Sequence, residues 1–464
     1  MAAPLVVAAL AASLVAGQAT GGQAQGGGAP GAATGSSTSA RPSPEAGAPG
    51  TPGEAEAGAS RTIVPLVELS LRTQILASSY TTPTTGTELA PQFLVEPGLA
   101  LTLGGGRVTF RASYVPRMLV VFSGPGEGTF VYQSVYLGLD SRLDASWTLM
   151  LSLNGTYGSQ SYLSPVAPPL GTAPGTPPTP TPFPGTPSLD SWSTFDTVTV
   201  TGRLSPLTTL RLVAGVTAQS GIGAESLASM PLQVGSRLEA ALDLRLSRPN
   251  VLATSAYAQV GRLAREVSTP EGVATVHRIS FFTGVLETWR HALGPRTDTS
   301  LGLGAAYANS ESLTRLSYQR FMPSAEAGIR QGFTLEEGAR GVAPEPGRGT
   351  TGVVLAAMLA VLPYIDPYTA LVYNRGTAAL SADWTFGPQW RSSTTFSGAL
   401  VPYRGRVAER SGTATLTAGY LPLRFVTVEA GAFYQYQSGL PGLVYSFTSW
   451  GGSLTLILTE RARL

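Results

Sequence analysis

The sequence predicts an all-β fold: a single up-and-down antiparallel transmembrane β-barrel of about 18 strands, with about 16 as the fallback, behind a disordered N-terminal segment. Three observations predict it. Stretches with apolar residues at every second position follow one another from residue 63 to the C-terminus. The connections between them alternate between short and long. Charged residues are only 12% of the chain although 43% is hydrophobic, which leaves a water-exposed surface short of charge.

Residues 88–115 show the repeating unit as one hairpin. Leu89, Phe93 and Val95 begin an alternation with polar neighbours, and Phe110 and Tyr114 resume it after the glycines at 104–106. Glycine adopts positive φ at no steric cost, so this triplet suits a tight turn. No helix follows the triplet to make it a phosphate-binding loop. Each arm exceeds the roughly 5 to 6 residues of an ordinary strand and reaches the roughly 9 to 11 that cross a bilayer at a tilt.

Two size classes of connection alternate along the chain. Short ones are expected at residues 104–106, 143–146, 205–208, 247–250, 293–296, 386–389 and 421–424. Longer ones are expected at residues 79–87, 123–128, 159–194, 220–230, 262–275, 309–322, 402–411 and 437–443. This alternation is typical of a transmembrane barrel with tight periplasmic turns and long extracellular loops. The segments 336–349 and 363–367 are harder to assign, and the proline-rich stretch 164–187 is expected to form an extended outer loop.

The first 62 residues do not belong to the barrel. Residues 1–19 are predicted to be a signal peptide, with an apolar core at 5–16 followed by small residues, although no Lys or Arg precedes the core. Residues 20–62 are Gly, Ala, Ser, Thr and Pro with hardly any large apolar side chain, so they are predicted to be a disordered linker. The barrel is assigned to residues 63–464.

Composition excludes several kinds of chemistry. The chain has no cysteine, which excludes disulfides, thiolate zinc sites and a lipid-anchored N-terminal cysteine. The net charge is only +2 and the 30 basic residues are not clustered, so nucleic-acid binding is not predicted. The only histidines, His277 and His291, lie near opposite ends of one predicted strand, roughly 45 Å apart. We therefore predict no catalytic site, no metal and no cofactor, and a protein that is not an enzyme.

The last strand carries a resemblance to a known family. Residues 449–456 read Ser-Trp-Gly-Gly-Ser-Leu-Thr-Leu, and Ser449, Gly451, Leu454 and Leu456 resemble the C-terminal barrel-assembly signal of bacterial outer-membrane β-barrel proteins, including porins. That family usually ends on Phe, whereas this chain continues to Leu464. The resemblance implies an integral protein of the outer membrane of a Gram-negative bacterium. Its implied partners are the membrane lipid and the barrel assembly machinery.

Alternation divides the predicted strands into two faces. The apolar face suits lipid and comprises Val67, Leu69, Leu71, Val95, Leu99, Leu101, Leu238, Leu242, Leu244, Leu416, Leu454, Leu456 and Leu458. Charges in a bilayer are costly unless they face a wet cavity, so the polar face is predicted to line a lumen. Its principal lumenal charge candidates are Arg72, Arg107, Arg111, Arg237, Glu239, Asp243 and Arg245. Arg107 and Arg111 are four apart, so both are expected on one face of one strand, without an acidic neighbour on that strand.

Aromatic residues gather near the predicted strand ends. Two interpretations apply: interfacial girdles at the two membrane surfaces, or the general preference of aromatic residues for strands. Their place beside the short turns favours girdles. The residues concerned are Tyr114, Trp147, Tyr157, Trp289, Trp390, Tyr420 and Trp450.

The predicted function is a passive pore for small polar or anionic solutes. At this strand number side chains no longer fill the interior, so an aqueous channel is expected. About 13 inward arginines against about 9 acids predict a weak preference for anions. The alternative is a structural or surface-interaction barrel, an adhesion or anchoring platform acting through its long extracellular loops.

Overall fold

The computed structural model describes residues 64–463, with gaps at 83–85, 106, 124–126, 162–187, 224–225, 228–229, 270–271, 312–316, 335–351, 366–370, 388, 404–405 and 439–446. The predicted signal peptide and linker lie outside the described residues, as do the proline-rich stretch and the segment 336–349. Among the described residues, no helix is long and apolar enough to cross a membrane.

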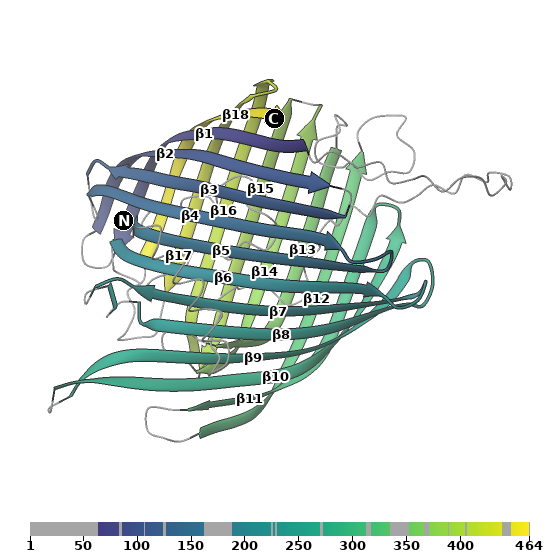
Figure 1. Ribbon diagram of the computed structural model, residues 1–464. Helices are drawn as coiled ribbons and strands as arrows, with labels where there is room; N and C mark the ends of the chain where they lie inside the picture. The colour runs from purple at the N-terminus through teal and green to yellow at the C-terminus, as the bar shows by residue number, and fades with distance from the viewer. Residues whose placement is uncertain are drawn as a thin grey trace, which may run out of the picture.

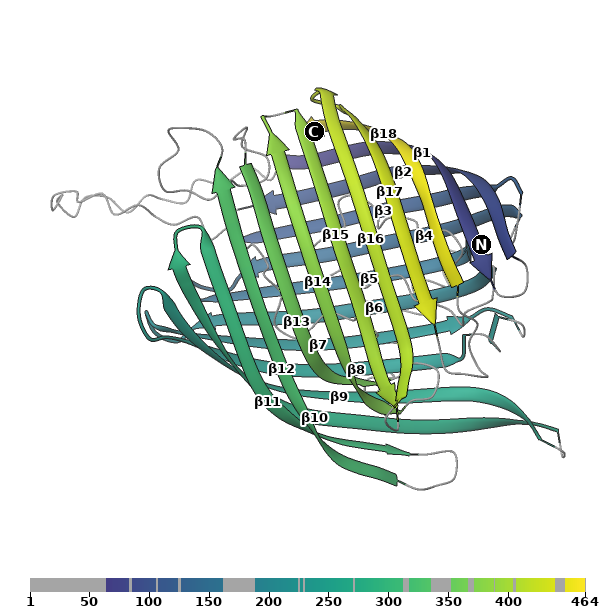
Figure 2. The same ribbon diagram turned by 180° about the vertical axis from the view of Figure 1, so that it is seen from behind.

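The chain forms one sheet of 18 antiparallel strands, in which each strand pairs with its neighbours in sequence (Figures 1 and 2). This confirms the predicted up-and-down order and strand count. The strands are β1 (Val64–Thr82), β2 (Gly86–Gly105), β3 (Val108–Val121), β4 (Gly128–Arg142), β5 (Trp147–Ser161), β6 (Ser188–Arg203), β7 (Thr208–Gly221), β8 (Leu232–Arg245), β9 (Asn250–Thr269), β10 (Gly272–Gly294), β11 (Thr297–Glu311), β12 (Ser317–Thr334), β13 (Gly352–Ile365), β14 (Val372–Phe386), β15 (Trp390–Tyr403), β16 (Arg406–Leu423), β17 (Val426–Ser438) and β18 (Phe447–Arg463).

The sheet closes on itself because β18 pairs with β1 as well as with β17. The seam between β1 and β18 runs from the pair Leu66 and Arg463 to the pair Thr81 and Thr448 without a register shift. Closure removes both sheet edges, which would otherwise leave backbone groups unpaired in lipid. Both described chain ends lie at one end of the barrel, together with the short turns. We call this the turn end and the opposite one the loop end.

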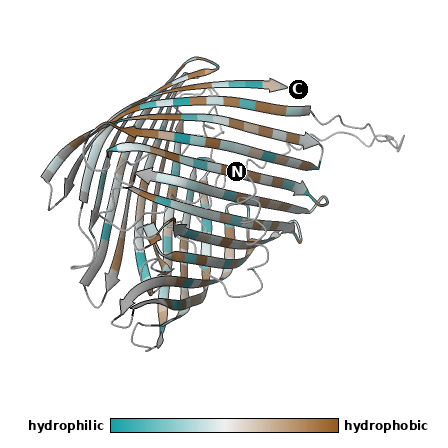
Figure 3. Ribbon diagram, turned by 60° about the vertical axis from the view of Figure 1, so that its left-hand side comes forward, coloured by the Kyte–Doolittle hydropathy of each residue, from teal (hydrophilic) through white to brown (hydrophobic). Residues whose placement is uncertain are grey.

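Hydropathy alternates along the strands (Figure 3). Exposure and register place the apolar residues on the outer face and most of the charged residues on the inner face. On β1 the outward Leu69 and Ile75 are 57% and 63% exposed, whereas the inward Arg72 and Gln74 are buried. Directly paired residues of antiparallel strands share a face, and the register carries this assignment around the wall. All the leucines and valines assigned to lipid in the sequence analysis lie on the outer face.

Outward aromatic residues gather at two levels of the barrel. Near the turn end the rings of Trp390 and Tyr420 lie 4.5 Å apart, and Trp289 stacks on His291. Toward the loop end, Tyr307 and Phe321 are 5.5 Å apart between ring centroids. Two separated levels fit the girdle interpretation better than a general strand preference.

The short connections lie where they were expected, but several long ones do not. The predicted loops at 79–87, 262–275 and 402–411 are mostly strand: β1 continues to Thr82, β9 and β10 leave only residues 270–271 between them, and β15 and β16 leave only 404–405. The hairpin of β9 and β10 extends past its neighbours in both views (Figures 1 and 2). Strands that run beyond the bilayer lose their apolar face but keep their backbone pairing. The sequence criterion therefore mistook them for loops.

Candidate functional site

The inner wall is the candidate site, and its register places most of the predicted charges there. Arg72, Arg111, Arg237, Arg245, Glu239 and Asp243 all lie in inward positions. Arg107 differs from the expectation, because it lies exposed in the turn after β2 and not on a strand face shared with Arg111. Arg111 has an acidic neighbour on the next strand, since its guanidinium is 3.2 Å from the Asp140 carboxylate. The sequence of one strand does not show an ion-pair partner that lies on the neighbouring strand.

One buried charge cluster lies beside the seam. Glu96 on β2 accepts a hydrogen bond from Arg72 of β1 at 3.0 Å, and its second carboxylate oxygen is bound by Arg117 of β3. Only 2% of the Glu96 side chain is exposed. The sequence analysis missed Arg117, although it continues the alternation of Ser113 and Val115.

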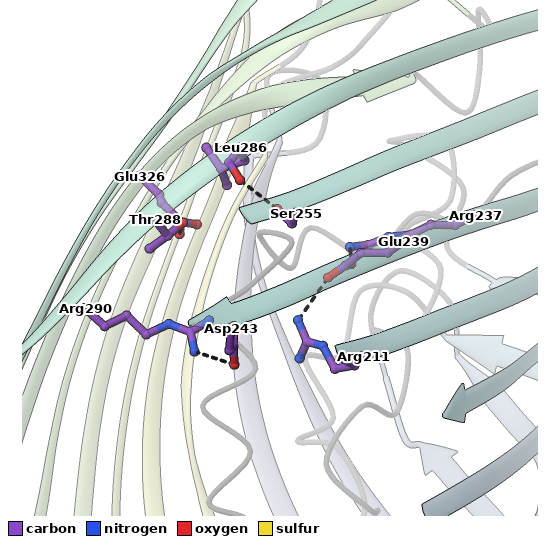
Figure 4. A network of polar contacts seen from close by, with 9 residues as sticks. All are labelled: Arg211, Arg237, Glu239, Asp243, Ser255, Leu286, Thr288, Arg290 and Glu326. Carbon is purple, nitrogen blue, oxygen red and sulfur yellow. Dashed lines mark hydrogen bonds and ion pairs between the residues drawn. The ribbon is translucent and has the colours of Figure 1, made fainter. Parts of the chain in front are cut away.

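A second cluster lies on β7 to β12 (Figure 4). Glu239 of β8 binds Arg211 at 3.0 Å and also pairs with Arg237 on its own strand. Asp243 of β8 lies 3.5 Å from Arg290 of β10. Farther along the wall, Glu326 of β12 accepts a hydrogen bond from Thr288 at 2.7 Å. Both clusters repeat the same arrangement, in which one glutamate holds two arginines on the inner face.

Hydroxyl side chains line other sectors of the wall. On β15 and β16 the inward Ser397 and Thr413 lie 2.5 Å apart and both are exposed toward the lumen. Ser393 donates to Asp383 at 2.8 Å. On β5 and β6, Thr156 and Ser193 lie 2.6 Å apart, and further inward hydroxyls there and on β16 are Thr197, Thr199, Thr201, Thr415 and Thr417.

Toward the loop end the inner wall becomes apolar and covered. Leu94, Leu119 and Phe130 belong to a buried cluster on β2 to β4, and a second one on β9 to β14 includes Tyr257, Phe282 and Leu286. At the same end of the barrel, the connection after β7 lies against β6 and β7. A Cβ on the inward Gly221 would lie 2.2 Å from the backbone carbon and oxygen of Ser226, so only glycine allows this approach. Met230 of the same connection is 1% exposed.

The residues of the predicted assembly signal lie on β18. Ser449 and Gly451 point inward, and Leu454 and Leu456 point outward. Glycine is required at position 451 for a steric reason, because a Cβ there would lie 2.2 Å from the Ala77 carbonyl oxygen of β1. The motif thus belongs to the strand that closes the barrel. Recognition of this motif by the barrel assembly machinery stays a prediction.

The histidines are on the outer face. His277 lies 3.4 Å from Arg262, and His291 lies 2.8 Å from Asn250. Within the described part of the chain, no group of three or more His, Asp or Glu side chains is placed to hold a metal ion.

A closed barrel with an apolar belt, aromatic girdles and a charged inner wall has the architecture of outer-membrane porins. The chain belongs to the EpsX exopolysaccharide export family, whose model matches residues 67–462. A search of the curated proteins found no match.

Solved structures with some similarity include an outer membrane protein and an iron transporter. The outer membrane protein OpdK of Pseudomonas aeruginosa is 12% identical, and the alignment covers 86% of this chain and 99% of OpdK with a TM-score of 0.41. The FrpB iron transporter of Neisseria meningitidis is 10% identical, with 80% of this chain and 62% of FrpB covered and a TM-score of 0.45.

The cluster beside the seam yields a stability prediction. Glu96→Gln leaves two arginines without their carboxylate in a buried site, which should destabilise the barrel by about 3–5 kcal/mol. The folded form should convert to the unfolded band on SDS gels at a lower temperature. The control is Glu68→Gln, whose partner Arg461 is 68% exposed and whose loss should cost less than about 1 kcal/mol. Equal shifts in the two variants would contradict a buried role for Glu96.

The connection over Gly221 yields a conductance prediction. Gly221→Val should displace this connection from the inner wall and raise the single-channel conductance in planar bilayers. Gly294→Val is the control, because a Cβ there meets no atom within 4 Å. If the folded Gly221→Val protein conducts like the parent, the connection does not narrow the lumen.

Proposed function

We propose that this chain forms the outer-membrane passage through which a polysaccharide leaves the cell during exopolysaccharide export. Membership of the EpsX exopolysaccharide export family supports a role in exopolysaccharide export. The observation that carries the proposal for the chain itself is the exposed hydroxyl sector of the inner wall on β15 and β16. A hydroxyl group both donates and accepts hydrogen bonds, as the hydroxyl groups of a sugar do. Many exchangeable contacts of this kind bind a polymer weakly at any one place, which is what conduction requires.

The charge clusters fit the same role. Each glutamate of the two clusters is held by two arginines, so its carboxylate is fully paired and the group of three keeps a net charge of only about +1. A wall of this kind presents few isolated charges that would trap a passing polymer. The turn end is then the periplasmic entrance, following the usual topology of bacterial barrels.

The same lumen supports the pore for small polar or anionic solutes that the sequence predicts, and the two proposals differ in the size of the solute. The alternative of a surface-interaction platform rested on long outer loops. Three of the expected long loops are strand, which weakens its basis.

The export proposal is tested in cells that lack the chain. Complementation with the parent should restore extracellular polysaccharide. The double variant Ser397→Leu, Thr413→Leu makes the hydroxyl sector apolar and should reduce secretion severalfold while the folded protein remains in the membrane. The control variant Thr394→Leu, Ala414→Leu changes outward neighbours on the same strands and should secrete normally. Normal secretion without the chain, or by the folded inward variant, would exclude the proposal.

Ion selectivity provides a second test in a planar bilayer. Inward arginines outnumber inward acids, so reversal potentials in a KCl gradient should show a weak anion preference. The preference should decrease as salt screens the lumen. A cation preference would contradict the assigned charge of the inner wall, and the absence of any steady current would contradict a pore.

A further inference from the structure

Three successive turns at the turn end share one sequence pattern. Each begins with Arg-Leu followed by Asp or Ser: residues 142–144, 203–205 and 245–247. In each turn the leucine N–H donates to the carbonyl four residues later, at 2.9 Å for Leu143 and 3.0 Å for Leu204 and Leu246. The Asp or Ser side chain caps the turn, as where the Asp144 carboxylate accepts the N–H of Trp147 at 2.8 Å. The arginine therefore has the same position in three separate turns.

Each of these arginines is fixed to the preceding turn by its backbone. The N–H of Arg142 donates to the Arg107 carbonyl at 2.7 Å, that of Arg203 to Ser146 at 2.9 Å, and that of Arg245 to Leu207 at 2.8 Å. The three strands β4, β6 and β8 end on these residues. Because neighbouring strands are about 4.8 Å apart, successive arginines are spaced roughly 10 Å along the rim. We call Arg107, Arg142, Arg203 and Arg245 the arginine arc.

The register directs three of the four arginines of the arc toward the mouth of the lumen and not toward lipid. Arg142, Arg203 and Arg245 occupy inward positions at their strand ends. The leucine that follows each one comes next in the alternation and is more than half exposed, which suits contact with the lipid interface. An arginine that served lipid headgroups would occupy the outward position instead. The arc thus belongs to the pore entrance.

The arc carries uncompensated charge. All four arginines are exposed, and none has an ion pair within the part of the chain that the structure describes. Of the acids near these turns, Asp140 pairs with Arg111 and Asp243 pairs with Arg290. The Asp144 carboxylate accepts N–H groups of its own turn and keeps its charge, so one carboxylate stands against four arginines. A row of like charges at one rim attracts a polyanion and raises its local concentration.

We propose that the arginine arc is the entry site for an acidic polysaccharide, one that bears carboxylate, sulfate or phosphate groups. This inference rests on the proposed export function and adds the charge class of the substrate and the end from which it enters. The guanidinium fork binds carboxylate and phosphate groups in bidentate fashion, and exposed arginines release them readily in water. The arc captures the polymer, and the hydroxyl sector lets it move onward.

The test is polymer block of single channels in bilayers of zwitterionic lipid only. Dextran sulfate and neutral dextran of equal length are added to each side in turn. Since the chain has no cysteine, Ala145→Cys in an exposed turn provides a unique thiol, and an impermeant thiol reagent then identifies the turn-end side. Dextran sulfate should block faster from the turn end than from the loop end, and faster than neutral dextran. High salt should remove the difference.

Variants assign the effect to the arc. Arg142→Gln, Arg203→Gln should lower the rate of block by dextran sulfate about tenfold, and addition of Arg245→Gln should lower it further. The matched control, Arg262→Gln, Arg410→Gln, removes two outward arginines near the loop end and should leave the rate unchanged. Heat-dependent migration on SDS gels confirms that every variant is folded.

The outcomes separate the two proposals. If both dextrans enter equally from both ends, or if the folded double variant retains the parental rate, the arc has no role, although polymer passage stands. If neither polymer changes a steady current, the proposal of polymer passage is wrong, and so is the proposed role of the arc.

Discussion

Pairing of the backbone within the bilayer is the constraint on which the rest of this structure depends. A membrane offers no water to satisfy N–H and C=O groups, so the sheet must close, and the strand that closes it is also the last one made. Closure explains the glycine at position 451, where β1 approaches so closely that no Cβ fits. It also fixes the register around the wall, and the register decides which side chain faces lipid and which faces the lumen.

Because of this division, one wall contacts two different environments. The outer face contacts the hydrocarbon of the membrane, whereas the inner face contacts water and a hydrated solute. The charge clusters brace the inner face: Glu96 connects β1, β2 and β3, and Glu239 connects β7 with β8. Removal of a glutamate would leave its arginines uncompensated, so each cluster is stable only as a whole. The wall therefore gains rigidity from groups whose carboxylates are all paired with arginines.

The sequence predicted the two faces well because alternation is a local property of each strand. It could not predict what depends on pairing between distant strands. No acidic partner was predicted for Arg111, because Asp140 is on the next strand. Glycine is needed at positions 221 and 451 because segments distant in the sequence approach these positions in the folded chain. Arg107 was misplaced because the boundary between strand and turn falls beside it. The extended hairpins were taken as loops because pairing continues where the apolar face ends.

The two ends of the barrel differ in a way that bears on direction. A wall that bound an acidic polymer tightly along its whole length would hold it, and a wall without charge would not attract it. Among the described residues, four exposed arginines without an ion pair lie together at the turn end, whereas farther inside the arginines of the two clusters share glutamates or give way to hydroxyls. Attraction of an anion is thus strongest at the entrance and lower beyond it. If the chain exports an acidic polymer as proposed, this arrangement raises the rate of entry at the turn end without deepening the energy well along the rest of the lumen.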